Sequence, residues 1–271
     1  MAWEPNNEGE DPPQPFSLKS KDEIHTVKLY QFEASPPCAI VRALLAWAEV
    51  PYDVVQVNYP FKSEISWSKY QKIPILVVND MQVKSSLFGL RVMVFQVNDS
   101  FIIAKCLSPC LFGREATQHE LNLMKEITFG VMVAVEIELF SDDKDRSNFV
   151  DAFFSDDCCS QTFVKPLVLL MVSQAPDRIR KSKPEVKPLS EYGETFKKGL
   201  QGNYIGGSSV GPADLMLWAL AEMCKHVRST LMENWLLKND LTGWYERVAG
   251  ETETDTLLTA IMATKKSIWT Q

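Results

Sequence analysis

The sequence predicts a two-domain protein in which an α/β half is followed by an all-helical half. Residues 26–108 alternate between strand and helix patterns, whereas after about residue 112 only helical spacing of apolar residues remains. A chain of 271 residues, 45% hydrophobic and 23% charged, is long enough and apolar enough for two ordinary globular domains. We expect a first domain over residues 26–112 and a second over residues 113–271, after a disordered leader over residues 1–25.

The α/β half is expected to contain three strands and a helix before residue 80. Strand patterns cover residues 27–32, 52–57 and the short apolar run 75–78, and residues 39–48 repeat apolar side chains at helical spacing. A strand, a helix and a second strand in this order form a parallel, right-handed unit, which requires a sheet covered on both faces.

The second half is expected to contain helices over residues 114–140, 161–180, 212–227, 231–249 and 254–268. Residues 141–147 and 181–189 are rich in Lys, Asp, Ser and Pro and are expected to form loops. Asp214 is placed to close a capping box at the start of the third of these helices, with Pro212 at the first helical position. We assign that box no chemistry.

The composition excludes several classes of function. A formal charge of −7 argues against nucleic acid or an anionic membrane as the main partner. The six cysteines follow no disulfide or zinc spacing, so we expect reduced thiols and no metal site. No apolar run reaches the ~18 residues of a transmembrane helix, and the acidic, proline-rich start matches no signal peptide. We expect a cytoplasmic protein, or one peripheral to a membrane.

The segment from Ser35 to Cys38 lies where a strand turns into a helix, and it carries the most informative pattern in the chain. A Cys-Pro-x-Cys at such a junction would form a redox site, because a helix N-terminus stabilises a thiolate. Here Ser35 stands in the place of the first cysteine, and Cys38 is expected to be half-buried. A serine hydroxyl cannot replace a thiolate in disulfide exchange, which disfavours a dithiol enzyme. The alternative is that Ser35 only caps the helix, with Pro36 at its first position.

Several short segments, in their order and spacing, carry a resemblance to a known family. They are residues 28–45, 51–58, the run Trp67-x-x-Tyr70-x-Lys72-Ile73-Pro74-Ile75-Leu76-Val77, and residues 97–100, 205–207, 213–215 and 244–248. Their combination is similar to the glutathione transferase superfamily, in which a thioredoxin-like domain precedes a helical domain. Within that superfamily it resembles the membrane-associated type 2 prostaglandin E synthases. Residues 113–198 match poorly.

The resemblance implies a glutathione site in the first domain. It places a cis peptide at Ile73-Pro74, where the peptide groups of Ile73 can pair with the extended backbone of glutathione. The alternative is a trans proline that starts an edge strand. The resemblance also places Asp99 and Ser100 at the γ-glutamyl end of glutathione, with the Ser100 amide facing the carboxylate and Asp99 facing the ammonium group. The alternative there is an ordinary helix cap.

The resemblance also implies the chemistry. Tyr30, Pro36 and Pro37 complete the expected glutathione contacts, and Ser35 and Cys38 are the catalytic candidates. Ser35 would donate a hydrogen bond to the sulfur of glutathione, as in serine-type transferases. The expected activity is a glutathione-dependent isomerisation or transfer on a hydrophobic small molecule such as prostaglandin H2, by a protein that forms a homodimer. Haem is implied by the family alone, since the sequence offers no identifiable axial ligand.

Two other functions stay open. The loss of the first cysteine favours a non-catalytic binding or scaffold protein of the same fold, and a glutaredoxin-like reductase would depend on Cys38.

Residues 83–96 interrupt the resemblance. Without them, residue 82 would run directly into residue 97, giving a strand, a tight turn, a strand and a helix. The segment repeats its own boundary, with Gln82-Val83 at one end and Gln96-Val97 at the other, and it can be encoded from GT to CAG. We hypothesise that it is a translated intron, which sequencing of cDNA tests. The alternative is a genuine insertion that forms an extra hairpin or helix and displaces the nearby glutathione pocket.

Overall fold

The computed structural model describes residues 20–58, 61–68, 70–83, 91–154 and 165–251. The chain forms two compact units, Met1–Ala116 and Thr117–Gln271. The boundary expected at residue 112 falls at the last residue of helix α2 (Ser100–Phe112). Of the expected leader, only residues 20–25 are described, and they contain the short 3-10 helix η2 (Lys21–Glu23).

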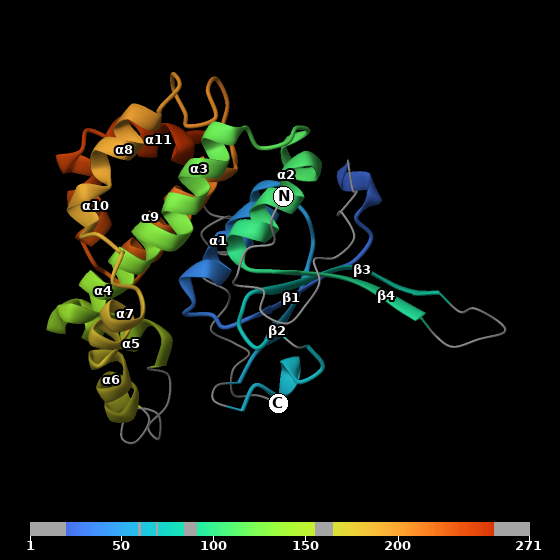
Figure 1. The fold of residues 1–271 in the computed structure, drawn as a ribbon, viewed down its shortest axis with the longest axis horizontal. Helices are drawn as coiled ribbons and strands as arrows, with labels where there is room; N and C mark the ends of the chain where they lie inside the picture. The colour runs from blue at the N-terminus through green and yellow to red at the C-terminus, as the bar shows by residue number, and fades with distance from the viewer. Residues whose placement is uncertain (1–19, 59–60, 69, 84–90, 155–164, 252–271) are drawn as a thin grey trace. The chain divides into compact units, whose positions relative to one another are not determined.

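The first unit is built on a four-stranded sheet with the order β2-β1-β3-β4 (Figure 1). Its strands are β1 (Val27–Gln31), β2 (Asp53–Gln56), β3 (Ile75–Val83) and β4 (Arg91–Asn98). β1 and β2 are parallel because helix α1 (Pro36–Trp47) joins them, whereas β3 is antiparallel to both β1 and β4. The predicted parallel strand–helix–strand unit is confirmed.

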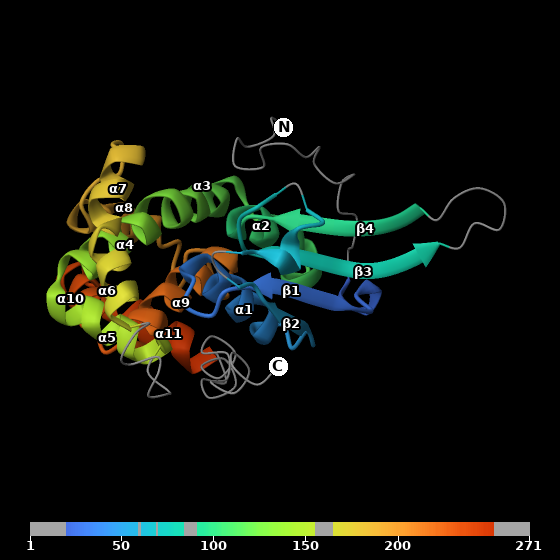
Figure 2. The same cartoon turned by 90° about the horizontal axis from the view of Figure 1, so that it is seen from below.

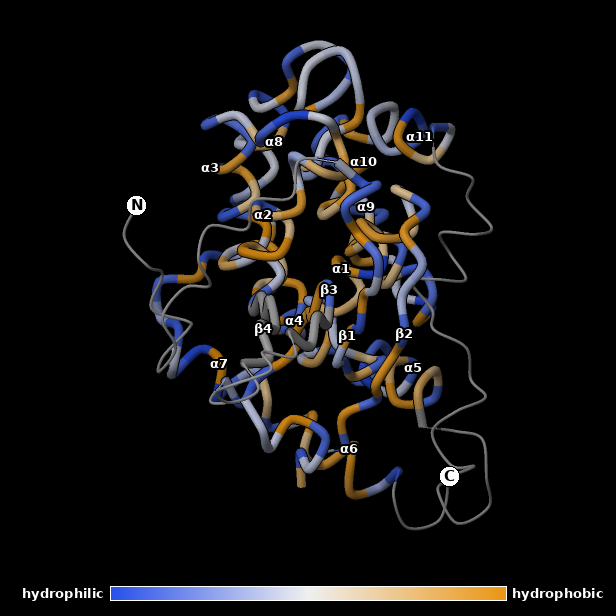
Figure 3. The backbone as a smooth tube through the Cα atoms, turned by 90° about the vertical axis from the view of Figure 1, so that its right-hand side faces the viewer, coloured by the Kyte–Doolittle hydropathy of each residue, from blue (hydrophilic) through white to orange (hydrophobic). Residues whose placement is uncertain are grey.

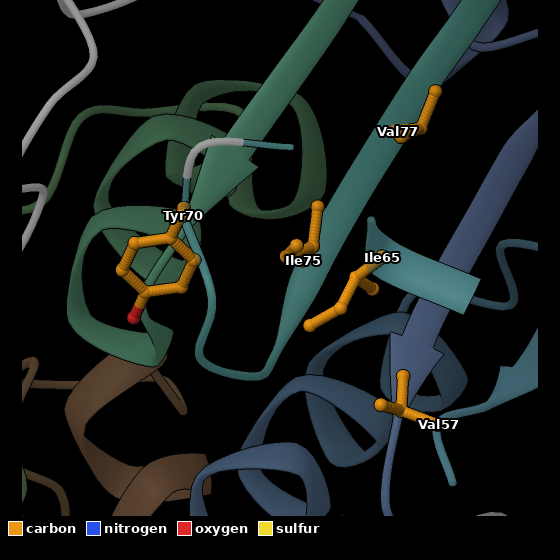
Figure 4. Packing of buried hydrophobic residues seen from close by; sticks show 5 residues of the cluster. All are labelled: Val57, Ile65, Tyr70, Ile75 and Val77. Carbon is orange, nitrogen blue, oxygen red and sulfur yellow. The ribbon is translucent and has the colours of Figure 1, made fainter. Parts of the chain in front are cut away.

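Both faces of this sheet bury apolar side chains. One face carries a buried cluster from β3, the 3-10 helix η3 (Ser63–Ile65) and the segments around it: Val57, Ile65, Tyr70, Ile75 and Val77 (Figure 4). Leu76 and Val78 are fully buried and point to the opposite face, because successive side chains of a strand alternate. On the edge of the sheet, α2 contacts β4, and α1 packs against α2.

The third strand is longer than the sequence predicts, because β3 continues past residue 78 to Val83. The inserted segment 83–96 supplies the last residue of β3 and most of β4, while residues 84–90 lie outside the described part of the chain. Its described residues therefore form a hairpin, which is the form expected of a genuine insertion. Translation of an intron stays a hypothesis about its origin.

The second unit is helical throughout its described residues. Its elements are α3 (Gln118–Glu126), the π-helical turn η4 (Ile127–Val131), α4 (Met132–Ser141), α5 (Asp143–Phe154), α6 (Lys165–Ser173), α7 (Ala175–Ser182), η6 (Leu189–Glu191), α8 (Gly193–Gly199), α9 (Pro212–His226), α10 (Leu231–Lys238) and α11 (Thr242–Glu251). Helix α9 is the centre of this unit, because it contacts α3, η4, α10 and α11 and its side chains are buried almost throughout. Figure 3 colours the backbone of each helix by the hydropathy of its residues.

Asp214 is the polar anchor of this helical core. Its Oδ2 accepts a hydrogen bond from the Gly211 amide at 3.0 Å, which confirms the predicted capping box. Its Oδ1 accepts from the Ile205 amide at 2.8 Å and from Trp244 Nε1 at 2.7 Å. Burial raises the pKa of this carboxyl, and these hydrogen bonds act in the opposite direction.

Two of the predicted helices are broken in the structure. The helix predicted over residues 161–180 forms α6 and α7 within its described part, because Pro176 lies in the first turn of a new helix. The helix predicted over residues 231–249 breaks between α10 and α11, where Asp240 adopts a φ of 58°. Residues 254–268 lie outside the described part.

The loop predicted over residues 141–147 is wrong, because α5 begins inside it. Asp142 Oδ1 accepts a hydrogen bond from the Asp145 amide at 2.8 Å, as an N-cap side chain does, and Phe149 and Val150 anchor the helix in the core. The helix predicted over residues 114–140 begins later than expected, after a capping box between Thr117 and Glu120.

None of the helices in the described part of the chain combines the length and the hydropathy of a membrane-spanning helix.

Candidate functional site

The three segments that carry the predicted site adjoin the same end of the strands β1, β3 and β4. Tyr30 on β1 pairs with Ile75 on β3, and Ile75 pairs with Asn98 on β4. Adjacent strands lie about 4.8 Å apart, so these three positions form one row across the sheet. β1 and β4 end at this row and β3 begins there. The turn before α1, the residues before β3 and the turn before α2 are therefore neighbours, although they are far apart in the sequence (Figure 2).

The residues before β3 include the Ile73-Pro74 peptide, which is cis as the sequence predicts. Pro74 is buried, and the side chain of Ile73 packs against the apolar cluster of the sheet. Within the described part of the chain, no hydrogen bond engages the N–H or C=O group of Ile73. These two backbone groups are therefore available to a ligand.

The turn before α2 brings Asp99 and Ser100 to the same edge. Asp99 is the N-cap, and its Oδ1 accepts a hydrogen bond from the Phe101 amide at 2.9 Å. The cap interpretation is thus confirmed. Asp99 also adopts a φ of 70°, an uncommon conformation for a residue with a side chain. The Oγ of Ser100 is buried without a hydrogen-bond partner among the described residues, which is an energetically costly state.

Ser35 is the N-cap residue of α1, and its backbone C=O accepts hydrogen bonds from the Cys38 and Ala39 amides, both at 3.0 Å. Its side chain, however, makes no cap hydrogen bond. The side chain of Ser35 acts to lower the pKa of the neighbouring Cys38 thiol. Ser35 is half-buried, so the hydroxyl lies between a buried thiol and the surface.

Cys38 is fully buried, so the expectation of a half-buried thiol is wrong. The reason is that α1 is covered by the core on the face that carries Cys38. Burial raises the pKa of the Cys38 thiol, and the hydrogen bond to Ser35, the charge of Arg42 and a hydrogen bond to the Phe32 backbone only partly offset this. Cys38 is therefore a protonated, inaccessible thiol at neutral pH.

The sequence motifs do not reveal a buried polar cluster that lies beside Cys38. Arg42 lies one turn after Cys38 on α1 and is 1% exposed. Its Nη1 donates to Gln31 Oε1 at 2.6 Å and its Nη2 donates to the Glu33 carbonyl at 3.0 Å. These bonds tie α1 to the last residue of β1 and to the turn that leads to Ser35. An arginine within an otherwise apolar helix is the sequence signal that would have revealed this cluster.

The remaining predicted contacts serve the packing of the first unit. The ring of Tyr30 meets that of Trp67 edge-on, with 5.3 Å between ring centroids, and it packs against the apolar cluster. Pro36 and Pro37 form the first turn of α1. Contact of these three residues with glutathione stays a prediction.

The described residues contain no group of three or more His, Cys, Asp or Glu side chains that could hold a metal ion. Haem also fits this site poorly, because Cys38, the thiol at this site, is fully buried.

Part of the chain is similar in sequence to proteins named prostaglandin E synthase 2. No protein-family model matches the chain. Prostaglandin E synthase 2 from Danio rerio is 34% identical over 93 residues, which are 34% of this chain and 21% of that protein. The Mus musculus protein of the same name is 37% identical over 94 residues, 35% of this chain and 22% of that protein. The matched segment thus spans about a fifth of the length of these curated relatives.

A crystal structure of a glutathione transferase family member from Pseudomonas fluorescens, with two glutathione bound, superposes with a TM-score of 0.50. It is 13% identical, and the match covers 91% of this chain and 96% of that one. At this identity the likeness establishes the fold alone. The chain has the fold of the glutathione transferases, a thioredoxin-like domain followed by a helical domain, and it resembles prostaglandin E synthase 2 over about a third of its length.

Proposed function

We propose that residues 26–112 form a glutathione-binding domain and that the chain is a glutathione-dependent enzyme. The observation that carries this proposal is the row Tyr30, Ile75 and Asn98, which gathers three loop segments at one edge of the sheet. Each segment offers a group that matches one part of glutathione: a backbone for its peptide, a helix N-terminus for its γ-glutamyl end and a hydroxyl for its thiol.

The peptide part of glutathione would pair with Ile73. The N–H and C=O groups of Ile73 precede the first residue of β3, so an extended ligand can add to this edge as a short strand. These backbone hydrogen bonds would hold the ligand. Because Ile73 lies just before β3, they would also align the ligand backbone with that of Ile73.

The γ-glutamyl end would bind at the start of α2. Ser100 is the first residue of this 13-residue helix, where backbone amides lack partners within the helix and the helix dipole favours an anion. The carboxylate would accept hydrogen bonds from the Ser100 amide and from its unpartnered hydroxyl, while the Asp99 carboxylate would attract the ammonium group.

The thiol would lie near Ser35, whose hydroxyl would donate to the glutathione thiolate. Such a thiolate can attack an electrophilic, hydrophobic acceptor. By similarity to prostaglandin E synthase 2, we propose isomerisation of an endoperoxide such as prostaglandin H2, by a homodimeric protein that is cytoplasmic or peripheral to a membrane. Glutathione alone is proposed as the cofactor.

A second candidate function is that of a non-catalytic glutathione-binding or scaffold protein. It is favoured by one observation: Cys38, the cysteine that remains in the motif, is fully buried. A glutaredoxin-like reductase is disfavoured, because such an enzyme needs an exposed thiolate and Cys38 is fully buried.

Calorimetric titration of reduced glutathione into the purified chain tests the proposal. We expect saturable binding that weakens by about tenfold in Ser100→Ala, since a hydrogen bond to a charged group contributes about 1.5–3 kcal/mol. Ser182→Ala, on the exposed end of α7, is the matched control and should bind as the wild type does. A folded wild-type chain that does not bind glutathione would contradict the proposal. Binding without turnover of prostaglandin H2 or a general electrophile would favour the scaffold function.

A further inference from the structure

The turn between β1 and α1 sets the position of Ser35. The Ser35 amide donates a hydrogen bond to the Phe32 carbonyl at 3.0 Å, which closes a β-turn over residues 32–35. Glu33 and Ala34 are the central residues of this turn, and both are buried. The Ser35 carbonyl in turn accepts the first backbone hydrogen bonds of α1. The place of the Ser35 hydroxyl therefore follows from the conformation of the turn.

Arg42, on the helix that follows, is hydrogen-bonded to this turn and to the strand before it. Its Nη2 donates to the Glu33 carbonyl at 3.0 Å, and its Nη1 donates to Gln31 Oε1 at 2.6 Å. Gln31 is the last residue of β1, and its carbonyl accepts from the Val57 amide at 2.7 Å, so this partner is fixed to the sheet. The Glu33 carbonyl belongs to the central peptide group of the turn, whose orientation distinguishes the main types of β-turn. The guanidinium thus holds that peptide group in one orientation relative to the sheet.

The burial of Arg42 argues for a role beyond packing. Arg42 is 1% exposed and Gln31 is fully buried. A buried charge is costly even when it is hydrogen-bonded, and an apolar side chain of similar volume often stabilises a fold equally well. What an apolar side chain cannot do is hold two acceptors at once, whereas the N–H groups of a guanidinium form a planar fork of fixed geometry.

We propose that Arg42 is a positioning residue for Ser35: its two hydrogen bonds hold the turn over residues 32–35 so that the Ser35 hydroxyl is aimed at the sulfur of bound glutathione. This inference rests on the proposed function, in which Ser35 donates to the glutathione thiolate. A donor stabilises a developing charge only within a narrow range of positions, and a displacement of about 1 Å can remove much of its effect. The role requires no contact between Arg42 and glutathione.

The test is the pKa of the glutathione thiol bound to the full-length chain, measured from the ultraviolet absorbance of the thiolate as a function of pH. Arg42→Met removes the fork, and we expect the pKa of the bound thiol to rise by about one unit, which lowers the thiolate at neutral pH by up to about tenfold. Affinity for S-methylglutathione, which has no thiol, should stay unchanged, because Ile73 and Ser100 are untouched. Arg178→Met is the matched control: Arg178 is exposed on α7 and also donates to a glutamine, Gln174 Oε1, at 2.6 Å. It should leave the pKa of the bound thiol unchanged.

A double-mutant cycle with Ser35→Ala separates positioning from a direct effect of the arginine's charge. If Arg42 acts through the Ser35 hydroxyl, Arg42→Met should cause no further rise of the pKa in the Ser35→Ala background, because the group that it positions is gone. An equal rise in both backgrounds would overturn the positioning role, since the charge would then act on the sulfur directly. A wild-type pKa of the bound thiol in a folded Arg42→Met variant would also overturn it.

The remaining outcomes separate the inference from the function on which it rests. If Arg42→Met fails to fold, Arg42→Lys keeps the charge without the fork and should raise the pKa of the bound thiol in the same Ser35-dependent way. A wild-type pKa in that variant would overturn the positioning role and leave glutathione binding intact. Absence of binding by the wild-type chain, for both glutathione and S-methylglutathione, would overturn the proposed function together with this inference.

Discussion

The two ends of the β3–β4 hairpin differ in what the rest of the first unit does with them. At one end, Ile75 has partners on both sides, Tyr30 and Asn98, and the adjoining turns carry the candidate site. At the other end, β3 has passed its last partner on β1 and pairs with β4 alone as far as Val83 (Figure 2).

The irregularity in the pairing of β3 with β4 lies beyond the strand ends that carry the candidate site. The register between the strands is unbroken from Ile75 to Val78, and it shifts only between Val78 and Met81. Asn79 lies in that shift with a φ of 52°. The register shift is thus confined to the end remote from the candidate site, and displacement of the glutathione pocket by the insert stays a prediction.

The largest effect is expected at the site end, from a single hydroxyl group. Ser35→Ala should lower glutathione-dependent turnover of a general electrophile by about 100-fold, because it removes the donor to the developing thiolate. Steady-state kinetics with the wild type, Ser35→Ala and Ser182→Ala measure this. A loss of less than threefold in Ser35→Ala would favour the scaffold function.

At the end of the hairpin remote from the site, the effect of a deletion on stability should depend more on the strand register it leaves than on the number of residues removed. In a chain that lacks residues 83–96, Met81 and Gln82 take the places of Phe95 and Gln96, and the strands close at Asn79-Asp80. A two-residue turn of this kind needs positive φ, which Asn79 already has. We expect the free energy of unfolding to change by less than about 1 kcal/mol, because a loop of this size contributes little closure entropy.

The matched control lacks one residue more, from 83 to 97. It moves Gln82 opposite the fully buried Leu76, and a one-residue slip of this kind reverses the two faces of the strand. We expect a loss of about 2–3 kcal/mol in urea unfolding, from a polar group placed against the core. Equal stability of the two deletions would refute the register argument.

Asn79 should contribute to stability and not to binding. Its Oδ1 accepts from the His25 amide at 2.7 Å, and its Nδ2 donates to the Glu23 carbonyl at 2.7 Å. Asn79→Ala should therefore lose about 2 kcal/mol of unfolding free energy, with glutathione affinity unchanged. Asn79→Asp keeps the acceptor and should lose less. A weaker affinity for glutathione in either folded variant would contradict the claim that Asn79 does not contribute to binding.

A smaller effect is expected from Asp99→Asn, which keeps the cap of α2 and removes its charge. Asparagine caps helices as well as aspartate and tolerates positive φ, so stability should change by less than about 0.5 kcal/mol. Loss of the attraction to the ammonium group should weaken glutathione binding by about tenfold, or 1.4 kcal/mol. Asp240→Asn, at another aspartate with positive φ, is the control for calorimetry. Unchanged affinity in Asp99→Asn would remove Asp99 from the site.

Much of the first unit could be predicted because its signals are local. Apolar runs predicted β1, β2 and the start of β3, and the change from strand to helix at Ser35 predicted α1. The position of Ile73-Pro74 before a buried strand was also predictable by resemblance. The buried cluster around Arg42 was not, because its partners Gln31 and Glu33 are ordinary polar residues until the fold brings them against one helix face.

The errors in the second unit have a common physical origin. Residues 141–147 are rich in charged side chains and were therefore predicted to form a loop. The hydrogen bond from the Asp145 amide to Asp142 instead caps a helix that begins there. Conversely, apolar spacing continues through Pro176 and Asp240, where the backbone breaks the helix. The full burial of Cys38 was likewise unpredictable, because it depends on how the core covers α1.

The most direct test of the central claim, that glutathione binds where the strands end together, is to follow backbone amide resonances while reduced glutathione is titrated into the full chain. The account predicts that the largest chemical-shift changes fall on Ile73, Ser100 and the turn before Ser35, with little change at Asn79 and Met81. Absence of saturable changes at Ile73 and Ser100, or changes centred on Asn79, would contradict it.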